Sequence, residues 1–426
     1  MGRRFCKQTI RDVAVDGRTI LVRTDYNVPL RDGQIADDLR IRASLPTLRY
    51  LLERGCRVVL MSHLGRPSGR EVALSLQPIA ERLEQLLGQP VRWVDDCVGD
   101  QVRRAVKTLA PGQVLLLENL RFYPEEEADD AVFARAIVQA VRPDYVVQDG
   151  FGVVHRAHAS TCAISLLVPS IAGLLLEKEV TAITSALERP ARPLVAVIGG
   201  AKVSDKLALI SRLIDQADTI LIGGAMANTF LAYRGYDMAD SLVEPDQQTA
   251  LEEIYQTAAR KVGADMVDDF LLLPVDVAVG RSEAATVRRE VAVDKLRPGD
   301  KALDIGSRTI EHFVAAVQRA GTVVWNGPLG YATTESFAIG SARVALAIAQ
   351  QQAATSIIGG GDTAEFILRW DGHDGASFSH VSTGGGASLE LMAGQPLPGV
   401  ENLLDAHGLG CYTKHKEYHD AEVDHR

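Results

Sequence analysis

The fold is decided by a pattern that is clearest in residues 194–210, LVAVIGGAKVSDKLALI. Five apolar residues, three of them β-branched, predict a strand over Leu194–Ile198 that is buried on both faces. A glycine-containing turn follows at Gly199–Lys202, and a stretch with helical periodicity comes next. The same order of strand, turn and helix recurs along the chain, which is typical of βαβ units and parallel sheets.

Working outward, the apolar runs predict strands in two halves of the chain. Those of the first half are Thr19–Arg23, Arg57–Met61, Val91–Val94, Val114–Leu117 and Tyr145–Gln148. Those of the second half are Leu194–Ile198, Thr219–Ile222, Phe270–Val275, Thr322–Trp325 and Thr355–Ile358. A length of 426 residues also favours two domains over one. The predicted fold class is α/β, with two doubly wound, Rossmann-like parallel-sheet domains joined by a hinge helix.

The boundary between the domains is predicted after a helix. Residues from Glu177 to Leu187 have helical character, and two prolines, Pro190 and Pro193, stop the helix. We expect an N-terminal domain over 1–176, the hinge helix over 177–192 and a C-terminal domain over 193–404. Residues 405–426 hold four of the ten histidines and little apolar content, which predicts a polar, loosely ordered tail.

Composition excludes several classes of function. A net charge of −10 argues against nonspecific binding to nucleic acid, which requires a basic face. The five cysteines are odd in number and form no C-x-x-C motif, which indicates a reducing compartment and no structural zinc. The start of the sequence has no apolar leader, and no run of about 18 apolar residues occurs. We therefore expect a cytoplasmic protein with no membrane partner.

Polar side chains in the first half gather just after the predicted strands. Three segments hold most of them, RTDYNVP at 23–29, SHLGRP at 62–67 and HRAH at 155–158, and Arg40 and Arg121 add two guanidinium groups. Guanidinium forks match phosphate and carboxylate oxygens two at a time. The set predicts an enzyme that handles a phosphorylated acid. The histidines His155 and His158 are interpreted as shaping the loop of Arg156, and Glu125–Glu127 as a solvated surface run.

The second half contains five glycine-rich turns that suit phosphate groups. They lie at Gly199–Lys202, Gly223–Ala225, Asn326–Pro328, Gly359–Thr363 and Thr383–Ser388. Glycine lets bare backbone N–H groups approach a phosphate, and a following helix N-terminus adds its dipole. Neither G-x-x-x-x-G-K-[ST] nor G-x-G-x-x-G occurs, which argues against a Walker-type loop and a dinucleotide site. The two halves together predict a kinase whose substrates bind on opposite domains and meet when a hinge closes.

The chain resembles the phosphoglycerate kinase family from about Ile20 to Val400. The matching segments are Arg23–Pro29, Asp38–Arg42, Leu60–Pro67, Leu115–Phe122, His155–Thr161, Gly199–Lys206, Val324–Pro328, Ile357–Ala364 and His380–Glu390. The resemblance implies a monomer that transfers a phosphoryl group reversibly between ATP and the carboxylate of 3-phosphoglycerate, with Mg²⁺, to give ADP and 1,3-bisphosphoglycerate. A carboxylate acceptor is already ionised at neutral pH, so no general base is expected.

The resemblance also assigns residues to the two substrates. The phosphoglycerate site falls on Asp25, Asn27, Arg40, His63, Arg66, Arg121 and Arg156. The nucleotide site falls on Gly200, Ala201, Lys202, Lys206, Gly224, Asn326, Pro328, Thr333, Gly360, Gly361, Asp362 and Thr363. Catalytic roles fall on Arg40, Lys202, Gly361 and Gly384, and Asp362 is the candidate Mg²⁺ ligand.

The sequence departs from the family pattern around the nucleoside. Thr333 stands where the family has the glutamate that holds the ribose, and Ala225 and Ala302 replace glycines. We expect an active kinase with a weakened or altered nucleoside preference, unless Glu335 reaches the ribose instead. Two alternatives stay open: a paralogue with another phosphoryl donor or a related acid, and a catalytically silent scaffold that keeps the fold.

Overall fold

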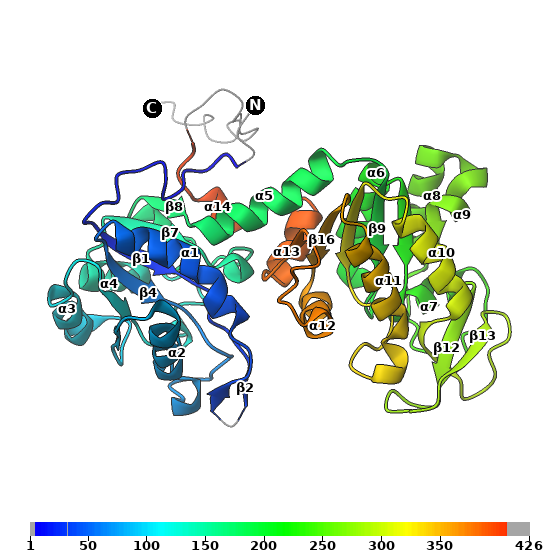
Figure 1. The fold of residues 1–426 in the computed structure, drawn as a ribbon, viewed down its shortest axis with the longest axis horizontal. Coiled ribbons are helices and arrows are strands. Elements are labelled where there is room, and N and C mark those ends of the chain that lie inside the picture. Colours follow the sequence, from blue (N-terminus) through cyan, green and yellow to red (C-terminus); the bar gives the residue numbers. More distant parts are fainter. Residues whose placement is uncertain (1–4, 32, 407–426) are drawn as a thin grey trace, which may run out of the picture. The chain divides into compact units, whose positions relative to one another are not determined.

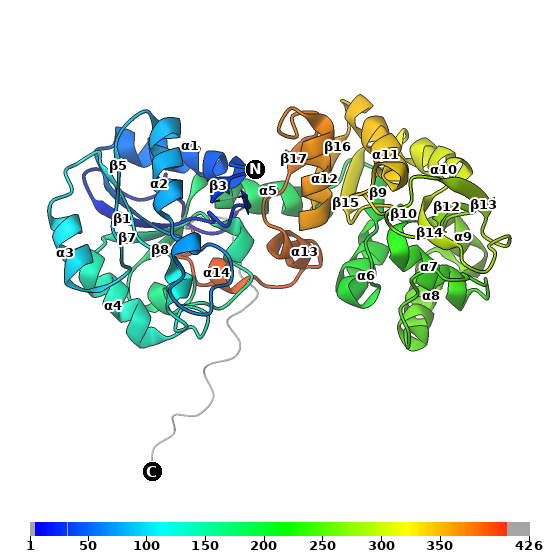
Figure 2. The same cartoon turned by 90° about the horizontal axis from the view of Figure 1, so that it is seen from below.

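The computed structural model describes residues 5–31 and 33–406, which form two compact units (Figures 1 and 2). The first unit comprises the described residues up to 150, residues 156–181 and the segment from 398 onward. The second comprises residues 151–155 and 182–397. Each unit therefore takes one short segment from the other half of the sequence.

The first unit is built on a six-stranded parallel sheet in the order β5-β6-β4-β1-β7-β8. Its strands are β1 (Thr19–Arg23), β4 (Arg57–Met61), β5 (Val91–Trp93), β6 (Val114–Leu116), β7 (Tyr145–Gln148) and β8 (Ser170–Ala172), and β2 (Leu30–Arg31) and β3 (Gln34–Ile35) form a separate hairpin. Its helices are α1 (Leu39–Glu53), α2 (Gln77–Leu87), α3 (Gly99–Lys107), α4 (Ala131–Val141) and α14 (Pro398–Glu401), and α5 (Leu174–Glu188) continues into the second unit.

Helices cover both faces of this sheet because its strands are apolar on both sides. In β1, Ile20 and Val22 belong to one core cluster, together with apolar residues of α1 and α2. The residue between them, Leu21, belongs to a second cluster with residues of α3 and α4. Successive side chains of a strand point to opposite faces, so one continuous apolar run fills two cores.

The second unit contains a six-stranded parallel sheet in the order β11-β10-β9-β15-β16-β17 and a three-stranded antiparallel sheet in the order β13-β12-β14. The strands are β9 (Leu194–Ile198), β10 (Thr219–Ile222), β11 (Leu271–Leu272), β12 (Asp276–Gly280), β13 (Arg289–Ala292), β14 (Lys301–Ile305), β15 (Thr322–Asn326), β16 (Thr355–Gly359) and β17 (His380–Val381). The helices are α6 (Leu207–Gln216), α7 (Gly224–Tyr233), α8 (Gln248–Val262), α9 (Val267–Phe270), α10 (Ser307–Val317), α11 (Ile339–Gln350), α12 (Gly361–Asp371) and α13 (Gly386–Met392).

The predicted fold class of two parallel-sheet α/β domains is confirmed. The predicted strand over Phe270–Val275 is wrong in its extent, because α9 ends at Phe270 and only Leu271–Leu272 pair with the sheet. The next strand, β12, begins after Pro274 and belongs to the antiparallel sheet, which the sequence analysis did not predict.

The hinge helix and the boundaries of the two units differ from the predicted ranges. The helix expected from residue 177 begins at Leu174, and the division between the units falls inside it. Residues 398–404 lie with the first unit because backbone hydrogen bonds join them to it. The Leu404 N–H donates to the Ser170 carbonyl at 2.9 Å, and the Leu404 carbonyl accepts from the Gln8 N–H at 2.7 Å. Of the predicted tail, Asp405 pairs with Lys7 at 2.8 Å, and residues 407–426 lie outside the described residues.

In the described part of the chain, Cys56, Cys97 and Cys162 carry free thiols. Among the helices of residues 5–31 and 33–406, none combines the length and the apolar character that crossing a membrane requires.

A buried carboxylate couples the stability of the first unit to pH. Asp149 follows β7, and its Oδ1 accepts from the N–H of Leu175 at 2.9 Å. Burial raises the pKa of Asp149 to about 7, against hydrogen bonds from Thr47, Leu175 and Leu176 that lower it. The folded protein thus keeps a proton that the unfolded chain releases near pH 4, so this group's stabilisation is present below pH 4 and is lost as pH rises through about 7.

We expect Asp149→Asn to remove this pH dependence. The parent should lose about 1.4 kcal/mol of unfolding free energy per pH unit across this window from Asp149 alone, since one proton is released there. The variant should match the parent near pH 4 and be more stable than the parent near pH 8. Hydrogen exchange of the β7 amides at several pH values, corrected for the intrinsic exchange rate at each pH, measures this within the first unit, and equal pH slopes for the two proteins would contradict it.

Candidate active site

The first unit brings its predicted site residues to one edge of the sheet. Asp25 follows β1, His63 follows β4 and Arg121 follows β6, so all three leave the carboxyl ends of parallel strands that are neighbours in the sheet. Ligands of open α/β sheets bind outside this edge. The short 3-10 helix that carries Arg121 (Leu120–Phe122) is capped by Asn119, whose side chain accepts the Arg121 N–H at 3.0 Å.

Arg40 lies in the first turn of α1 and is oriented by the loop after β1. Its Nη1 donates to Asp25 Oδ2 at 2.8 Å and to the Asn27 carbonyl at 3.3 Å. The Asn27 side chain in turn accepts the Gly65 N–H at 2.9 Å, which joins this loop to the loop after β4. The Arg40 side chain keeps 31% of its surface exposed, so the guanidinium is held in place and still reaches solvent.

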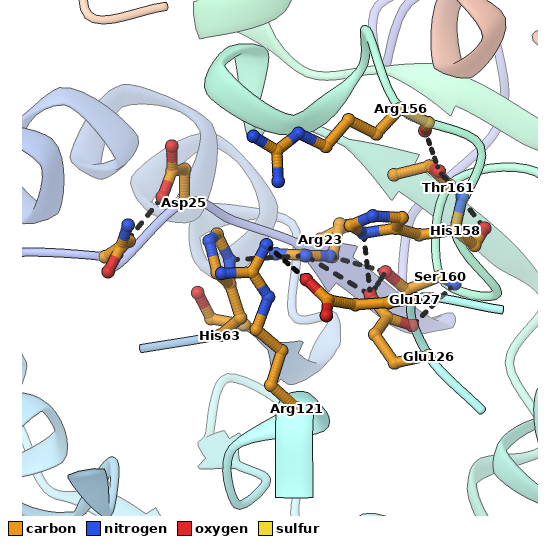
Figure 3. Close-up of polar contacts among 12 residues, drawn as sticks. Arg23, Asp25, His63, Arg121, Glu126, Glu127, Arg156, His158, Ser160 and Thr161 are labelled. Carbon is orange, nitrogen blue, oxygen red and sulfur yellow. Dashed lines mark hydrogen bonds and ion pairs between the residues drawn. The ribbon is translucent and has the colours of Figure 1, made fainter. Parts of the chain in front are cut away.

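Arg121 is held more tightly than Arg40. Its Nη1 donates to the Gly65 carbonyl at 2.7 Å, and its Nη2 pairs with Glu127 at 3.0 Å. Burial lowers the pKa of Arg121, Glu127 opposes this shift, and the charges of Arg23 and Arg156 add to it. Arg156 is therefore close enough to act on Arg121 (Figure 3). Arg66, on the loop after β4, is exposed.

Beneath these groups lies a buried ionic network that the sequence analysis missed. Glu126 is fully buried, and its carboxylate accepts from Ser160 Oγ at 2.6 Å and from Arg23 at 3.4 Å (Figure 3). The interpretation of Glu125–Glu127 as a solvated run is wrong for Glu126. Its partner Arg23 is a β-strand residue some hundred positions away, so nothing local in the sequence indicates the pair.

The second unit contains a cavity of about 650 Å³, a size typical of small-molecule sites. Of the predicted nucleotide residues, the wall includes Gly200, Ala201, Pro328, Thr333 and Asp362. The remainder of the wall is Ala225, Asp240, Ser241, Leu242, Val243, Glu283, Lys301, Ala302, Leu303, Gly330, Tyr331, Ala332, Glu365, Phe366 and Arg369.

Several glycines of the predicted turns serve close backbone packing. The N–H of Gly200 donates to the Pro328 carbonyl, and that of Gly224 to the Leu329 carbonyl, both at 2.9 Å. A Cβ on Gly224, which has φ +67°, would lie 2.6 Å from the Gly200 nitrogen. These two N–H groups are used inside the protein, so neither is left bare for a phosphate group. The turns meet closely instead, and of their residues Gly200, Ala201, Ala225 and Pro328 belong to the cavity wall.

Lys206 and Asn326 form a polar pair, and Lys206 lies next to Gly200 of the cavity wall. Lys206 Nζ donates to Asn326 Oδ1, and the N–H of the next residue, Gly327, donates to Thr363 Oγ1 at 2.6 Å. Burial lowers the pKa of Lys206 to about 8, and the carboxylate of Asp362 is the largest opposing influence. An ammonium group with so few protein anions around it is suited to phosphate oxygens.

The remaining predicted residues occupy loop ends and helix starts. Lys202 is exposed. The N–H of the next residue, Val203, donates to the Glu244 carboxylate at 2.7 Å. Gly360 donates its N–H to Ser388 Oγ at 3.0 Å. Gly361 begins α12, and a Cβ there would meet no atom within 4 Å, so this helix start is open to a ligand. Gly384 precedes α13, donates to Ser382 at 3.1 Å and packs against the ring of Phe151.

The departures from the family pattern surround the cavity. Thr333, Ala225 and Ala302 all belong to its wall, whereas Glu335 does not. The loop of Thr333 is fixed from two sides. Arg369 donates to the Ala332 carbonyl at 2.7 Å, and the Thr334 hydroxyl donates to the Glu283 carbonyl at 2.8 Å. The suggestion that Glu335 reaches the ribose is therefore not supported by its position.

The residues present fit a metal that arrives with a nucleotide. Asp362, at the start of α12, is exposed on the cavity wall. Its negative charge acts on Lys206 and opposes the lowering of that lysine's pKa by burial. Within the described part of the chain, no three acidic, histidine or cysteine side chains are grouped to hold a metal alone. Mg²⁺ commonly takes one or two carboxylates together with substrate phosphates and waters, which matches the single carboxylate of Asp362 beside the open start of α12.

Comparison with known proteins decides the family. The family model described as phosphoglycerate kinase matches residues 10–395. The chain belongs to the phosphoglycerate kinase family. The phosphoglycerate kinase of Moorella thermoacetica is 48% identical over 403 residues, covering 94% of this chain and all of that protein. That of Chloroflexus aurantiacus (strain J-10-fl) is also 48% identical, over 407 residues that cover 94% of this chain and 99% of that protein.

Solved structures of the family share the fold. The phosphoglycerate kinase structure from Coxiella burnetii matches with a TM-score of 0.81 at 35% identity, covering 93% of this chain and 98% of that one. The phosphoglycerate kinase from Pyrococcus horikoshii matches with a TM-score of 0.80 at 32% identity and the same coverage. The clustered arginines of the first unit and the cavity of the second thus lie in a phosphoglycerate kinase fold.

Proposed function

We propose that the protein transfers the γ-phosphoryl group of ATP to the carboxylate of 3-phosphoglycerate, reversibly and with Mg²⁺. As a member of the phosphoglycerate kinase family, the chain is a phosphotransferase. The observation that carries the proposal beyond the family is the set of Arg40, Arg121 and His63 at one sheet edge, with Asp25 and Asn27 placing Arg40. This set suits a small ligand with several negative charges.

In the proposed reaction a carboxylate oxygen of the acid attacks the γ-phosphorus of ATP. The new bond gives an acyl phosphate, and the bond to ADP breaks in the same in-line displacement. The attacking oxygen is already ionised, so the protein moves no proton. Its work is to align the two substrates and to stabilise negative charge on the transferring group, which we assign to Arg40 from the acid side and Lys202 from the nucleotide side.

On the nucleotide side, the cavity residues would hold the nucleoside, and Lys206, Gly361 and Thr363 the phosphates. Asp362 would hold the Mg²⁺, which neutralises charge on the phosphate oxygens. Helix α5 runs from one unit into the other, and we propose its residues near the division as a hinge that lets the two substrates meet. A monomeric state and a cytoplasmic location complete the proposal.

Steady-state phosphorylation of 3-phosphoglycerate tests the proposal, with ATP, GTP and other donors compared side by side. We expect turnover with ATP that depends on Mg²⁺. A high KM with little base preference is expected if Thr333 leaves the ribose without its usual charged partner, because such a bond contributes about 1.5–3 kcal/mol. Turnover only with another donor or acid would favour a paralogue, and no turnover with any donor would favour a silent scaffold.

A further inference from the structure

The first unit buries an arginine that the proposed reaction does not use. Arg23 is the last residue of β1, and none of its side chain reaches solvent. Its Nε donates to Ser160 Oγ and its Nη1 to the Thr24 carbonyl, both at 2.6 Å. Its Nη2 lies 3.4 Å from Glu126 Oε1 and 3.4 Å from Nδ1 of His63 (Figure 3). A buried charge of this kind needs a reason beyond packing.

The contact with Arg23 decides which nitrogen of His63 carries the proton. A guanidinium group has only donors, so Nδ1 of His63 must accept. The one proton of the neutral ring then lies on Nε2. Burial and the nearby charges of Arg23, Arg121, Arg40 and His158 all lower the pKa of His63 well below its ordinary value, so the ring stays neutral at physiological pH.

Glu126 keeps the guanidinium of Arg23 in place. Its Oε2 accepts from the Ser160 N–H at 3.0 Å and its Oε1 from the Ser160 hydroxyl at 2.6 Å, while that hydroxyl also accepts from Arg23. The carboxylate therefore balances the buried charge and fixes the serine that orients it. His63 is itself only 3% exposed, so its ring has little freedom to turn away from this network.

We propose that Arg23 and Glu126 are positioning residues that fix His63 in the Nε2–H tautomer, so that His63 meets the acid substrate as a neutral hydrogen-bond donor. The arginines then supply the positive charge, and His63 supplies a hydrogen bond of fixed orientation. Because burial and the neighbouring arginines lower the pKa of His63, this donor does not titrate in the physiological range, and its contribution to binding stays constant there. The inference rests on the proposed function for the identity of the acid, but the tautomer itself belongs to the free protein.

Nitrogen NMR of the free, full-length protein tests the tautomer without any assay of activity. In protein labelled with ¹⁵N-histidine, we expect an unprotonated Nδ1 and a protonated Nε2 for His63, with neither signal titrating between about pH 5.5 and 8. Loss of the signals in His63→Gln assigns them. A protonated Nδ1, or a ring that becomes charged near pH 6.5, would overturn the proposal even if the kinase activity is present.

Two substitutions of His63 test the same point in binding. Gln places an amide N–H near the position of Nε2, whereas Asn reaches only the position of Nδ1. We expect the KM for 3-phosphoglycerate to be about tenfold lower in His63→Gln than in His63→Asn, since one hydrogen bond to a charged ligand separates them. Equal KM values, or a lower value for Asn, would count against the Nε2–H donor.

Arg23→Lys tests the positioning role, because it keeps the positive charge and removes the planar guanidinium group with its several N–H donors. We expect averaged Nδ1 and Nε2 signals for His63 and a KM for 3-phosphoglycerate raised about tenfold, with the KM for ATP unchanged. If Arg23→Lys does not fold, Ser160→Ala loosens the same guanidinium and should act in the same direction. Unaltered His63 signals in a folded variant would refute the role. Glu125→Gln, an exposed neighbour of Glu126, is the control and should leave both readouts as in the parent.

Discussion

Arg40→Ala is expected to lower kcat by about 10³-fold and to leave the fold intact. An arginine that neutralises charge on a transferring phosphoryl group contributes 10³ or more in comparable enzymes, because its charge acts where negative charge is spread over the oxygens. Arg40 suits this role since Asp25 and the Asn27 carbonyl orient it while part of its guanidinium stays exposed. Steady-state kinetics with saturating substrates measure the loss.

The matched control for Arg40→Ala lies on the same helix. Arg49 is exposed on α1, and its Nη2 donates to the Leu86 carbonyl at 3.3 Å, so Arg49→Ala should leave kcat near that of the parent. Arg40→Lys keeps the positive charge but lacks the planar guanidinium group, so its kcat should lie between those of Arg40→Ala and Arg49→Ala. A kcat for Arg40→Ala within tenfold of the Arg49→Ala value would contradict the proposed role.

The parallel sheets could be predicted because each strand is one short apolar run that fills two cores. In β1 the run ILV serves both faces at once, so the pattern is continuous and easy to recognise. The antiparallel sheet of the second unit lacks that signal. Strand β13 is exposed at Arg289 and Glu290, and β12 follows β11 so closely that the two read as one apolar segment.

For the candidate site, too, some features could be predicted from the sequence and others could not. Asp25, His63 and Arg121 could be predicted to lie together, because each follows a strand and carboxyl ends of parallel strands share one edge. Whether each glycine turn binds phosphate or packs against another backbone segment could not be predicted from its composition. Both a bound phosphate and a neighbouring backbone require a missing Cβ, and the structure shows that Gly200 and Gly224 face each other while Gly361 faces open space.

Long-range charge pairs are the part of the site that sequence reasoning could least supply. Glu126 sits between two other glutamates, and three acidic residues in a row usually mark a solvated surface. Only the fold shows that the middle one turns inward to Arg23 while Glu127 turns to Arg121. The two flanking residues stay exposed, so one segment carries a surface charge, a site partner and a buried counter-ion.

This burial predicts a large loss of stability for Glu126→Ala. Removing the carboxylate leaves the Arg23 guanidinium without its compensating charge in a site from which solvent is excluded, and it also leaves the Ser160 N–H and hydroxyl without their acceptor. Breaking a buried ion pair from one side costs about 3–5 kcal/mol. Burial already lowers the pKa of Arg23, and Glu126 is the largest influence that opposes this shift, ahead of Asp25, so Glu126 is the main charge that compensates the guanidinium.

Because the chain folds as two units, the loss should be measured within the first unit and not from a single unfolding curve. Hydrogen exchange of the β1 and β7 amides reports the free energy of opening there. Glu126→Gln keeps one acceptor oxygen for Ser160 and should lose less than Glu126→Ala, whereas Glu125→Ala, at an exposed position, should stay within about 0.5 kcal/mol of the parent. Equal exchange rates in Glu126→Ala and Glu125→Ala would mean that the buried pair contributes nothing, and that Arg23 is held by its neutral partners alone.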